Sequence, residues 1–353
     1  MKKKTNVRNV NGKEKRPHVV TLGGGTGSFV LLSGLKEYPV SISAIVAMAD
    51  DGGSTGVLRD EMGVLPPGDV RSCLAALSRA TPEVRALFNY RFENSGLKGH
   101  SFGNLFLSAL EKTTGSFTNA VAVAGRILNV YGRVIPVTEG DMRLKVILKD
   151  DSVIFGENKL DDDERVRAVG VASVSLEKPV AASAEALAAI ESADLAVLGP
   201  GDLYSNLIPS LLVDGVADAF ARTRARLVFV ANITNKKGLT EGYTAEDYAH
   251  EIEKHLRGRR IDVLVFNTKA PDPALVERYE EQEGENMMVT LGNNKAGGRI
   301  VKTGDFLDEH AAHVNPNDKI AATRSFIRHA SVLLARAVIE CLEDGKRKSA
   351  KNT

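Results

Sequence analysis

Short apolar runs rich in β-branched residues alternate with longer segments that carry apolar residues at helical spacing. Runs of nearly continuous hydrophobicity are typical of strands that a parallel sheet buries on both faces. Such runs lie at 18–22, 41–50, 193–202, 226–234 and 261–268. The remaining segments predict helices at 28–37, 69–80, 82–91, 104–112, 117–129, 183–192, 244–257, 273–283 and 317–343. This alternation predicts a doubly wound α/β fold with a mostly parallel, Rossmann-like sheet.

The middle of the chain departs from this alternation. Three short strand-like runs follow the first helices, at 133–137, 142–148 and 152–155. Residues 156–168 are polar and are expected to form a surface loop, after which the strand "GVASVSL" (170–176) resumes the alternation. We therefore expect a single α/β domain over residues 17–343, with an inserted helical and small-strand region.

The net charge of +1 conceals basic ends and an acidic body. Residues 1–16 carry a net charge of +6 and residues 344–353 a net charge of +3, which leaves −8 for residues 17–343. Short terminal segments with many like charges are usually solvated. We expect both ends to be disordered basic tails, and contact of the tails with nucleic acid or an anionic membrane is the alternative.

The composition favours a cytoplasmic protein that binds no nucleic acid. Two cysteines, Cys73 and Cys341, are too few for a disulfide framework, and both are expected to be buried as small apolar side chains. No run reaches the ~18 apolar residues of a membrane span, and no apolar stretch of a signal peptide follows the basic start. Trp is absent and aromatic residues make up 5% of the chain, which argues against a surface that stacks on bases.

A glycine loop, "TLGGGTGS" (21–28), joins the first strand to the first helix. In this position backbone N–H groups at the helix N-terminus are free to bind an anion. The dinucleotide pattern G-x-G-x-x-G would require glycine where Ser28 stands, and a Walker loop would require a lysine. The loop therefore predicts an anion cradle of another kind, built from Gly24, Gly25, Thr26 and Gly27. A plain turn that packs the helix on the sheet is the alternative.

The second strand ends in "MADDGGSTG" (48–56). Asp50 lies 23 residues beyond Gly27, close to the spacing at which an acid binds a ribose hydroxyl in dinucleotide folds. Ser54 or Thr55 would cap the helix that follows. Two adjacent carboxylates, Asp50 and Asp51, would repel a phosphate unless a divalent cation or a sugar hydroxyl intervenes. Mg²⁺ held by Asp50 and Asp51 is thus a candidate cofactor, and helix capping by these acids is the alternative.

A third loop, "GPGDLYSN" (199–206), also follows a strand. Ligands of open α/β sheets bind beyond the carboxyl ends of the strands, where Gly199, Gly201 and Asp202 would lie. Asn232 ends the next strand, at the same expected edge. One asparagine alone is more often a cap than a ligand, but several strands that end in Gly, Asp or Asn at one edge predict a cleft.

Two further segments offer polar side chains at helix starts. "PPGDVRS" (66–72) places Asp69 as a helix cap and Arg71 where it could clamp a phosphate or form a surface ion pair. "GHSFGNL" (99–105) presents His100, an acid/base candidate, and Asn104, although loop structure would explain both. The chain contains no H-E-x-x-H, no cysteine pair for zinc and no G-x-S-x-G, and no residue is assigned a catalytic role.

Five ordered motifs resemble the bacterial gluconeogenesis factor family (YvcK-like), within the CofD-like superfamily of 2-phospho-L-lactate transferases. They are "TLGGGTGSFVLLSGLK", "AIVAMADDGGSTGVLRDEMGVLPPGDVRSCLAAL", "GHSFGNLFLSAL", "VLGPGDLYSNLIPSLLV" and "VFVANI", and the resemblance spans residues 18–335. It implies a cytoplasmic regulator that binds a nucleotide sugar, typically UDP-N-acetylglucosamine, and supports cell shape and carbon routing under gluconeogenic growth. No firm catalytic activity is attached to that family.

The resemblance also implies roles for individual residues. Gly24, Gly25, Thr26 and Gly27 would approach the ligand diphosphate. Asp50, Asp51, Ser54, Asn104, Gly199, Gly201, Asp202 and Asn232 would complete the cleft, and Tyr279 stands where the family carries a tyrosine linked to nucleotide-sugar binding. One departure concerns an Arg-His-Asp run before the last helix, where this chain reads "HVNPNDKIAA" (313–322).

Three functions remain open on the sequence. The first is a non-catalytic nucleotide-sugar sensor, expected to be a homo-oligomer that acts through a protein partner. The second is a metal-dependent transferase of a phospholactyl-type group from a nucleotide-diphosphate donor, with Asp50 and Asp51 holding the cation. The third, a dinucleotide-dependent oxidoreductase, rests only on the spacing of the glycines and the acid. The loop "ADDGGSTG", in place of the "N-T-G-D-D" of the transferase branch, favours the regulator.

Overall fold

The computed structural model describes residues 16–94, 96–293, 298–309 and 325–349. Seven strands form the central sheet: β1 (His18–Gly23), β2 (Ser41–Val46), β3 (Arg133–Pro136), β7 (Leu195–Leu198), β8 (Arg226–Val230), β9 (Val263–Asn267) and β10 (Ile300–Gly304). Their order is β10-β9-β8-β7-β1-β2-β3, and every neighbouring pair is parallel. This order confirms the predicted doubly wound, Rossmann-like sheet, and its topological switch point lies between β1 and β7.

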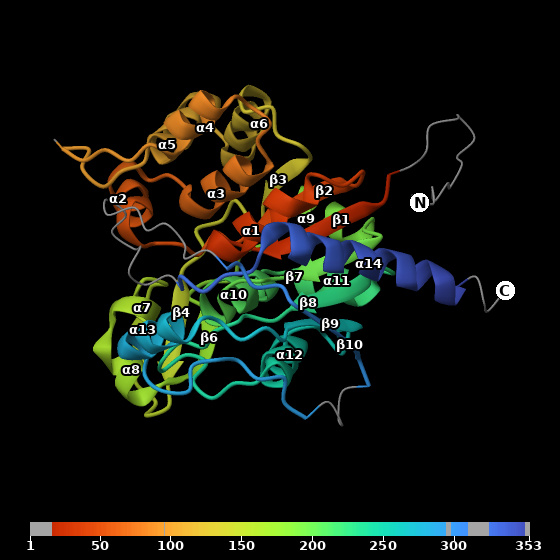
Figure 1. Cartoon of the computed structure of the whole chain (residues 1–353). Helices are drawn as coiled ribbons and strands as arrows, with labels where there is room; N and C mark the ends of the chain where they lie inside the picture. The colour runs from red at the N-terminus through yellow and green to blue at the C-terminus, as the bar shows by residue number, and fades with distance from the viewer. Residues whose placement is uncertain (1–15, 95, 294–297, 310–324, 350–353) are drawn as a thin grey trace, which may run out of the picture.

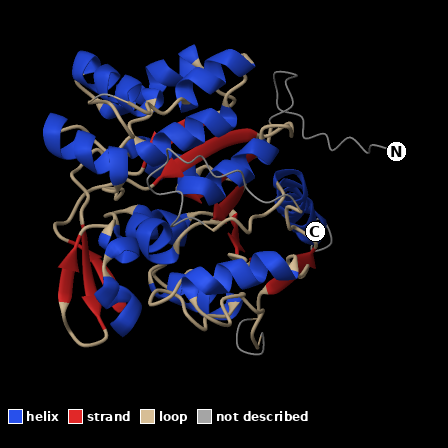
Figure 2. Cartoon of the chain, turned by 60° about the vertical axis from the view of Figure 1, so that its left-hand side comes forward, coloured by secondary structure: helices blue, strands red, loops and turns tan. Residues whose placement is uncertain are grey.

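A second sheet lies at one end of the molecule, away from the large one (Figure 2). Its strands are β4 (Leu144–Leu148), β5 (Val153–Phe155) and β6 (Val171–Leu176), which pair antiparallel in the order β5-β4-β6. The predicted insertion is therefore present. However, the run at 170–176 belongs to the small sheet and does not resume the parallel one. Residues 156–168, expected to be a loop, contain α7 (Lys159–Asp162) and α8 (Glu164–Val169).

Five helices fill the connection between β2 and β3 and gather together (Figure 1). They are α2 (Gly53–Met62), α3 (Gly68–Leu77), α4 (Pro82–Asn89), α5 (Phe102–Thr114) and α6 (Phe117–Ile127). The other helices before the last one are α1 (Gly25–Leu35), α9 (Ala184–Glu191), α10 (Ile208–Leu212), α11 (Val216–Arg222), α12 (Ala245–Lys254) and α13 (Pro273–Glu283). A π-helical turn, Leu203–Leu207, leads into α10.

The last helix, α14 (Ser331–Ser349), packs against α1 and against strands β7, β8 and β9. It begins well after residue 317, where the sequence pattern placed its start, and residues 310–324 lie outside the described residues. It also continues beyond residue 343, so the expected disordered tail 344–353 begins as helix up to Ser349. Residues 1–15 of the other expected tail lie outside the described residues.

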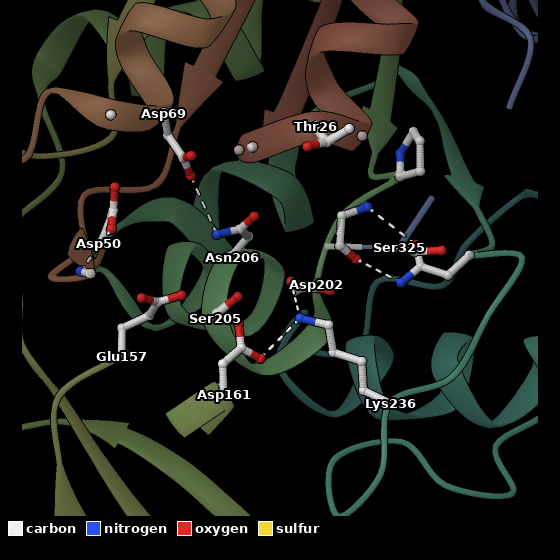
Figure 3. A pocket seen from close by; sticks show the side chains of 18 of the residues that line it. Thr26, Asp50, Asp69, Glu157, Asp161, Asp202, Ser205, Asn206, Lys236 and Ser325 are labelled. Atoms are coloured by element: carbon white, nitrogen blue, oxygen red, sulfur yellow. Dashed lines mark hydrogen bonds and ion pairs between the residues drawn. The ribbon is translucent and has the colours of Figure 1, made fainter. Parts of the chain in front are cut away.

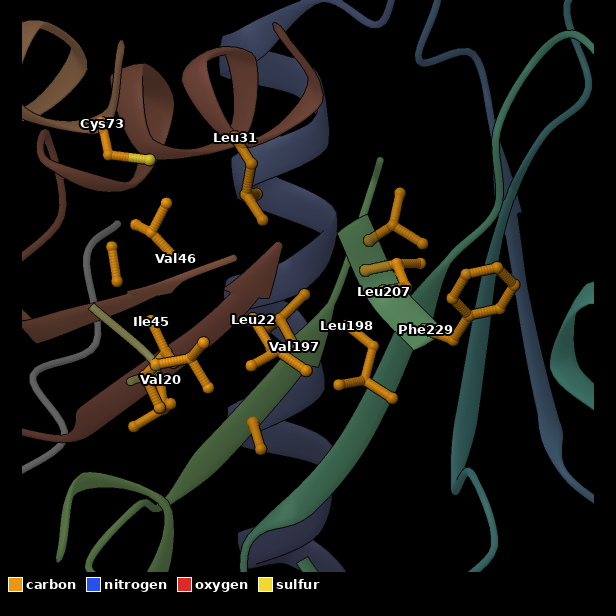
Figure 4. Close-up of a cluster of buried hydrophobic side chains, with 14 of the residues drawn as sticks. Val20, Leu22, Leu31, Ile45, Val46, Cys73, Val197, Leu198, Leu207 and Phe229 are labelled. Atoms are coloured by element: carbon orange, nitrogen blue, oxygen red, sulfur yellow. The ribbon is translucent and has the colours of Figure 1, made fainter. Parts of the chain in front are cut away.

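The core is built from the inner strands and the helices that cover them (Figure 4). All four residues of β7 are buried, as are five of the six in β1. Val20, Ile45, Val197 and Phe229 come from four adjacent strands, and each is at most 1% exposed. Cys73 and Cys341 are both buried, as predicted. This packing holds the strand ends and their loops in fixed positions, which is what a ligand site at the edge of the sheet requires.

Candidate functional site

The glycine loop turns directly from β1 into α1. Gly23 ends the strand, Gly24 is the N-cap with no side-chain cap, and Gly25 adopts a left-handed φ of +63°. The helix thus begins three residues earlier than the pattern predicted, inside the glycine run. Backbone N–H groups of its first turn have no intrahelical partner and carry the positive end of the helix dipole.

The loop after β7 lies against this turn, on the other side of the switch point. A Cβ built on Gly27 would be 2.2 Å from the Pro200 carbonyl oxygen, so the two loops approach too closely for a side chain. The Asn232 side chain, from the end of β8, accepts a hydrogen bond from the Gly201 N–H at 3.3 Å and donates one to the Gly201 carbonyl at 3.1 Å. Asn232 therefore orders the 199–202 loop.

The two neighbouring carboxylates after β2 have different surroundings. Asp50 Oδ1 accepts a hydrogen bond from the Gly52 N–H at 3.0 Å, and Asp50 lines the cleft. Asp51 oxygens accept hydrogen bonds from the backbone N–H groups of Glu157 at 3.2 Å and Asn158 at 2.7 Å. Asp51 thus ties the inserted region to the main domain and does not line the cleft. The N-cap of α2 is Gly52, not Ser54 or Thr55.

These loops surround one cavity of about 210 Å³ (Figure 3). Of the thirteen residues expected to bind a ligand, eleven line it: Gly24, Gly25, Thr26, Gly27, Asp50, Ser54, Asn104, Gly201, Asp202, Asn232 and Tyr279. The two exceptions are Asp51 and Gly199, both of which stand next to lining residues. Within the described residues, the structure thus gathers loops from β1, β2, β7 and β8 at one place.

Tyr279 lines the cavity, but its hydroxyl is already bound to the protein backbone. The side chain is 3% exposed, its hydroxyl donates to the Asn235 carbonyl at 2.8 Å, and burial raises its pKa to about 12. The ring packs edge-to-face on Phe326, with centroids 5.7 Å apart. Tyr279 therefore supports the cavity wall between α13 and the segment that precedes α14.

Charged side chains of both signs line the cavity. The carboxylates are Asp50, Asp69, Glu157, Asp161, Asp162 and Asp202, and the cations are Arg71, Arg91, Lys236 and Arg328. Figure 3 shows Asp50, Glu157 and Asp161 on one side, with Lys236 near Asp202 and Asp161. The formal charge of the lining is therefore −2, so a bound anion meets net repulsion unless protons or a cation compensate.

Burial and the nearby charges shift the pKa values of Glu157, Asp161 and Lys236. Burial, and then the nearby carboxylates of Asp50 and Asp161, raise the pKa of Glu157 well above its usual range. Burial also raises the pKa of Asp161, although Lys236 opposes the shift. Lys236 Nζ lies 2.9 Å from Asp161 Oδ1 and 3.1 Å from Asp202 Oδ2. Burial alone would lower the pKa of Lys236, but the two carboxylates more than offset it, and the ammonium stays charged.

Sequence reasoning missed most of the acids and the segment before α14. Asp69 was expected to be a helix cap, but the N-cap of α3 is Pro67, and the Asp69 carboxylate reaches the glycine loop. A Cβ on Gly24 would lie 2.0 Å from Asp69 Oδ2, which also accepts a hydrogen bond from Asn206 Nδ2 at 3.4 Å. The glycine before α1 therefore also makes room for a carboxylate.

Arg328 and His329 immediately precede α14 and line the cavity. Because α14 begins at Ser331, the residues directly before the last helix are Arg328, His329 and Ala330. The run at 313–322, which the sequence pattern placed there, lies outside the described residues. His329 is 7% exposed, its Nε2 has no hydrogen-bond partner, and burial lowers its pKa to about 4. In the sequence, the segment "FIRHA" (326–330) was the signal that could have identified this Arg-His pair.

The comparisons with known proteins agree with this architecture. Residues 19–307 match the family model of 2-phospho-L-lactate transferase CofD. The gluconeogenesis factor of Halalkalibacterium halodurans is 39% identical over 286 residues, which cover 80% of this chain and 88% of that protein. The gluconeogenesis factor of Bacillus subtilis is 36% identical over 286 residues, which cover 80% of this chain and 89% of that protein.

The fold agrees with a solved structure as well. A crystal structure of a UPF0052 family member from Bacillus halodurans superposes with a TM-score of 0.83 at 35% identity, covering 93% of this chain and all of that chain. The matched family model and these relatives together cover most of the described fold. The chain belongs to the gluconeogenesis factor (YvcK-like) family within the CofD-like superfamily.

Proposed function

We propose that this protein is a cytoplasmic regulator that binds a nucleotide sugar of the UDP-N-acetylglucosamine type in the cavity at the switch point. Through it, the protein supports cell-envelope synthesis and carbon routing under gluconeogenic growth. The relatives that are named gluconeogenesis factors support a role in gluconeogenic growth. Among the described residues, no helix is long and apolar enough to cross a membrane.

The observation that carries the proposal is the contact between the glycine loop and the 199–202 loop. The two loops follow adjacent strands at the switch point, where doubly wound sheets bind their ligands. Gly27 leaves no space between them, so the N-terminus of α1 is held toward the cavity. Backbone N–H groups at a rigid helix N-terminus suit a diphosphate, and polar groups beyond it, from Asn232 to Asp202, suit sugar hydroxyls.

The donor set fits Mg²⁺ only in company with ligand phosphates. Within the described residues, no three His, Cys, Asp or Glu side chains come together as a metal site. Asp51 already accepts two backbone hydrogen bonds, so it is a poor ligand. Mg²⁺ commonly uses one or two carboxylates and completes its shell with water and phosphate oxygens. Asp50 and Glu157 would supply those carboxylates, and the ion would neutralise the diphosphate charge that they oppose.

Direct binding measurements test this proposal. We expect UDP-N-acetylglucosamine, with Mg²⁺, to raise the melting temperature of the full chain and to give saturable heat in isothermal titration calorimetry. Asn232→Ala removes two hydrogen bonds that order the 199–202 loop and should weaken binding about tenfold or more. Asn119→Ala, an exposed residue on α6, is the matched control. Equal affinity in both variants, or no response to any uridine diphosphate compound, would reject the assignment.

A transferase remains the second candidate because residues 19–307 match the transferase model and several carboxylates face the cavity. In that case Mg²⁺ at Asp50 and Glu157 would stabilise a leaving nucleotide. Incubation with a guanosine-diphosphate phospholactate donor and an alcohol acceptor would then give turnover that Asp50→Asn abolishes. Binding of that donor without turnover would favour the regulator.

A further inference from the structure

The Ser54 hydroxyl stands at the wall of the cavity, in the first turn of α2, with two side-chain partners. Asn104 Nδ2, from α5, lies 3.2 Å from Ser54 Oγ. His100 Nδ1, from the loop before α5, lies 2.9 Å from the same oxygen. Ser54 and Asn104 line the cavity. The proposed function makes no use of His100.

A hydrogen bond with Arg71 fixes which atom of the Asn104 amide faces Ser54. Arg71 Nε lies 3.0 Å from Asn104 Oδ1, and a guanidinium can only donate. The Asn104 amide is therefore oriented with its oxygen toward Arg71 and its nitrogen toward Ser54. Since that nitrogen is a donor, Ser54 Oγ accepts from Asn104. One acceptor position and one proton of the hydroxyl remain for His100 and the cavity.

The protonation state of His100 Nδ1 decides where the hydroxyl proton points. If Nδ1 carries no proton, it accepts the Ser54 proton, and the hydroxyl offers no donor to the cavity. If Nδ1 carries a proton, in the neutral Nδ1–H tautomer or in the imidazolium, it donates to Ser54 Oγ, which then accepts two hydrogen bonds and has its own proton left to donate. Only the second state gives an anionic ligand oxygen a hydroxyl donor.

We propose that His100 is a positioning residue: by donating from Nδ1, it turns the Ser54 hydroxyl toward an anionic group of the ligand. The neutral Nδ1–H tautomer donates in the same way, but the negative charge of the ligand favours the imidazolium over it, so that ligand binding draws a proton from solvent onto His100. This inference rests on the proposed function, because it needs an anionic ligand in the cavity. It assigns that ligand a phosphate or similar oxyanion at the N-terminus of α2, a ten-residue helix whose dipole favours an anion there.

Other charged groups surround this pair and affect its pH dependence. The loop of His100 also carries Arg91, Glu93 and Lys98, and Arg71 approaches from α3. On the other sides of the cavity stand Asp50 and Glu157. A raised pKa lets Glu157 take up a proton when an anion binds, which would also strengthen binding as the pH falls. The test must separate the contributions of His100 and Glu157.

The test is calorimetric titration of the full chain with UDP-N-acetylglucosamine and, separately, with pyrophosphate, between pH 5.5 and 8.5. Two buffers of different ionisation enthalpy give the number of protons taken up. In the wild type we expect proton uptake and an affinity that falls as the pH rises through neutrality. The Ser54→Ala variant should bind about tenfold more weakly at low pH and lose that part of the pH dependence.

The His100→Asn variant distinguishes a positioning role of His100 from a purely structural one. The Nδ2 of His100→Asn can take the place of Nδ1 and donate at every pH, so affinity should stay near the low-pH value of the wild type with reduced proton uptake. His250→Asn, an exposed histidine on α12, is the matched control and should leave the profile unchanged. A purely structural role of His100 would lower affinity equally at every pH without changing the proton count.

The outcomes distinguish this inference from the proposed function. If UDP-N-acetylglucosamine binds with a pH profile and proton count that His100→Asn leaves intact, while Glu157→Gln removes them, the inference is wrong and the function stands. If neither probe binds the wild type at any pH, both fail. A weaker pH dependence and a lower proton count in both Ser54→Ala and His100→Asn, with Glu157→Gln keeping that part of the profile, support the inference.

Discussion

Replacing Gly27 with alanine would press a methyl group into the loop that follows β7. The new Cβ would lie 2.2 Å from the Pro200 carbonyl oxygen, 2.6 Å from its carbonyl carbon and 3.1 Å from the Gly201 nitrogen. Because non-bonded heavy atoms are most stable at about 3.5 Å or more, helix and loop would have to separate by about 1 Å. The obstructing atoms are backbone, so no side chain can rotate away.

Helix propensity and overpacking act in opposite directions on the free energy of unfolding of Gly27→Ala. Alanine favours a helix over glycine by about 1 kcal/mol. Overpacking a well-packed contact costs about 1–3 kcal/mol, and the short distances here place Gly27→Ala at or above the upper end. We therefore expect a net loss of about 2 kcal/mol in the free energy of unfolding, with a displaced 199–202 loop. Gly125→Ala in α6 is the matched control, since its nearest atoms are Leu74 Cδ2 at 3.9 Å and Val130 Cβ at 4.0 Å.

Urea unfolding of Gly27→Ala and Gly125→Ala measures the free energies that helix propensity and overpacking contribute. Gly125→Ala should gain about 0.5–1 kcal/mol, because it keeps the helix and meets no clash. Gly27→Ala should lose stability, and hydrogen exchange should become faster in residues 199–207 while the rest of the sheet is unchanged. A Gly27→Ala protein as stable as Gly125→Ala, with unchanged exchange in that loop, would refute the close contact on which the site argument depends.

Three further results are expected. Asp51→Asn replaces one acceptor oxygen with a donor facing the Glu157 and Asn158 N–H groups, so it should cost about 1–2 kcal/mol and speed hydrogen exchange in residues 156–162. Because burial lowers the pKa of His329 to about 4, the unfolded chain takes up a proton below about pH 6.5 and the folded chain does not. Stability should therefore fall by about 1.4 kcal/mol per pH unit from pH 6.5 to 4, a loss that His329→Gln removes in urea titrations at the two ends of that range. Burial raises the pKa of the Cys73 thiol, so a thiol-specific reagent should react with Cys73 only when urea unfolds the chain, and reaction under native conditions would contradict its burial.

The parts of the site that the sequence predicted are those in which local pattern and position in the fold coincide. A glycine run after a buried strand has few structural uses, and "GGGTG" and "GPGD" both follow inner strands. The parallel sheet then brings their loops together without further information. Strand β10 escaped notice because it is a short edge strand with a mixed burial pattern, and α7 and α8 are too short to show helical periodicity.

The errors have a different physical origin. Asp50 and Asp51 were assigned to one cleft, but neighbouring residues of the turn between β2 and α2 have different partners. One faces the ligand cavity, and the other binds the inserted region. Arg328 and His329 come from the far end of the chain, and nothing local shows that the segment before α14 crosses to the glycine loop. Such contacts depend on tertiary packing, which hydrophobic periodicity cannot describe.

The charge of the cavity links its ligand, its protons and any cation to one another. Adding a diphosphate to a lining of formal charge −2 raises the electrostatic cost of binding unless positive charge arrives with it. On the proposed function, two sources would supply it: a proton, taken up by Glu157 or by His100, and a divalent cation shared between the diphosphate and Asp50. Because either source relieves the same repulsion, each lowers the need for the other. A cleft of this kind would bind the proposed anion with an affinity that depends on pH and on divalent cations, as the proposed sensor function requires.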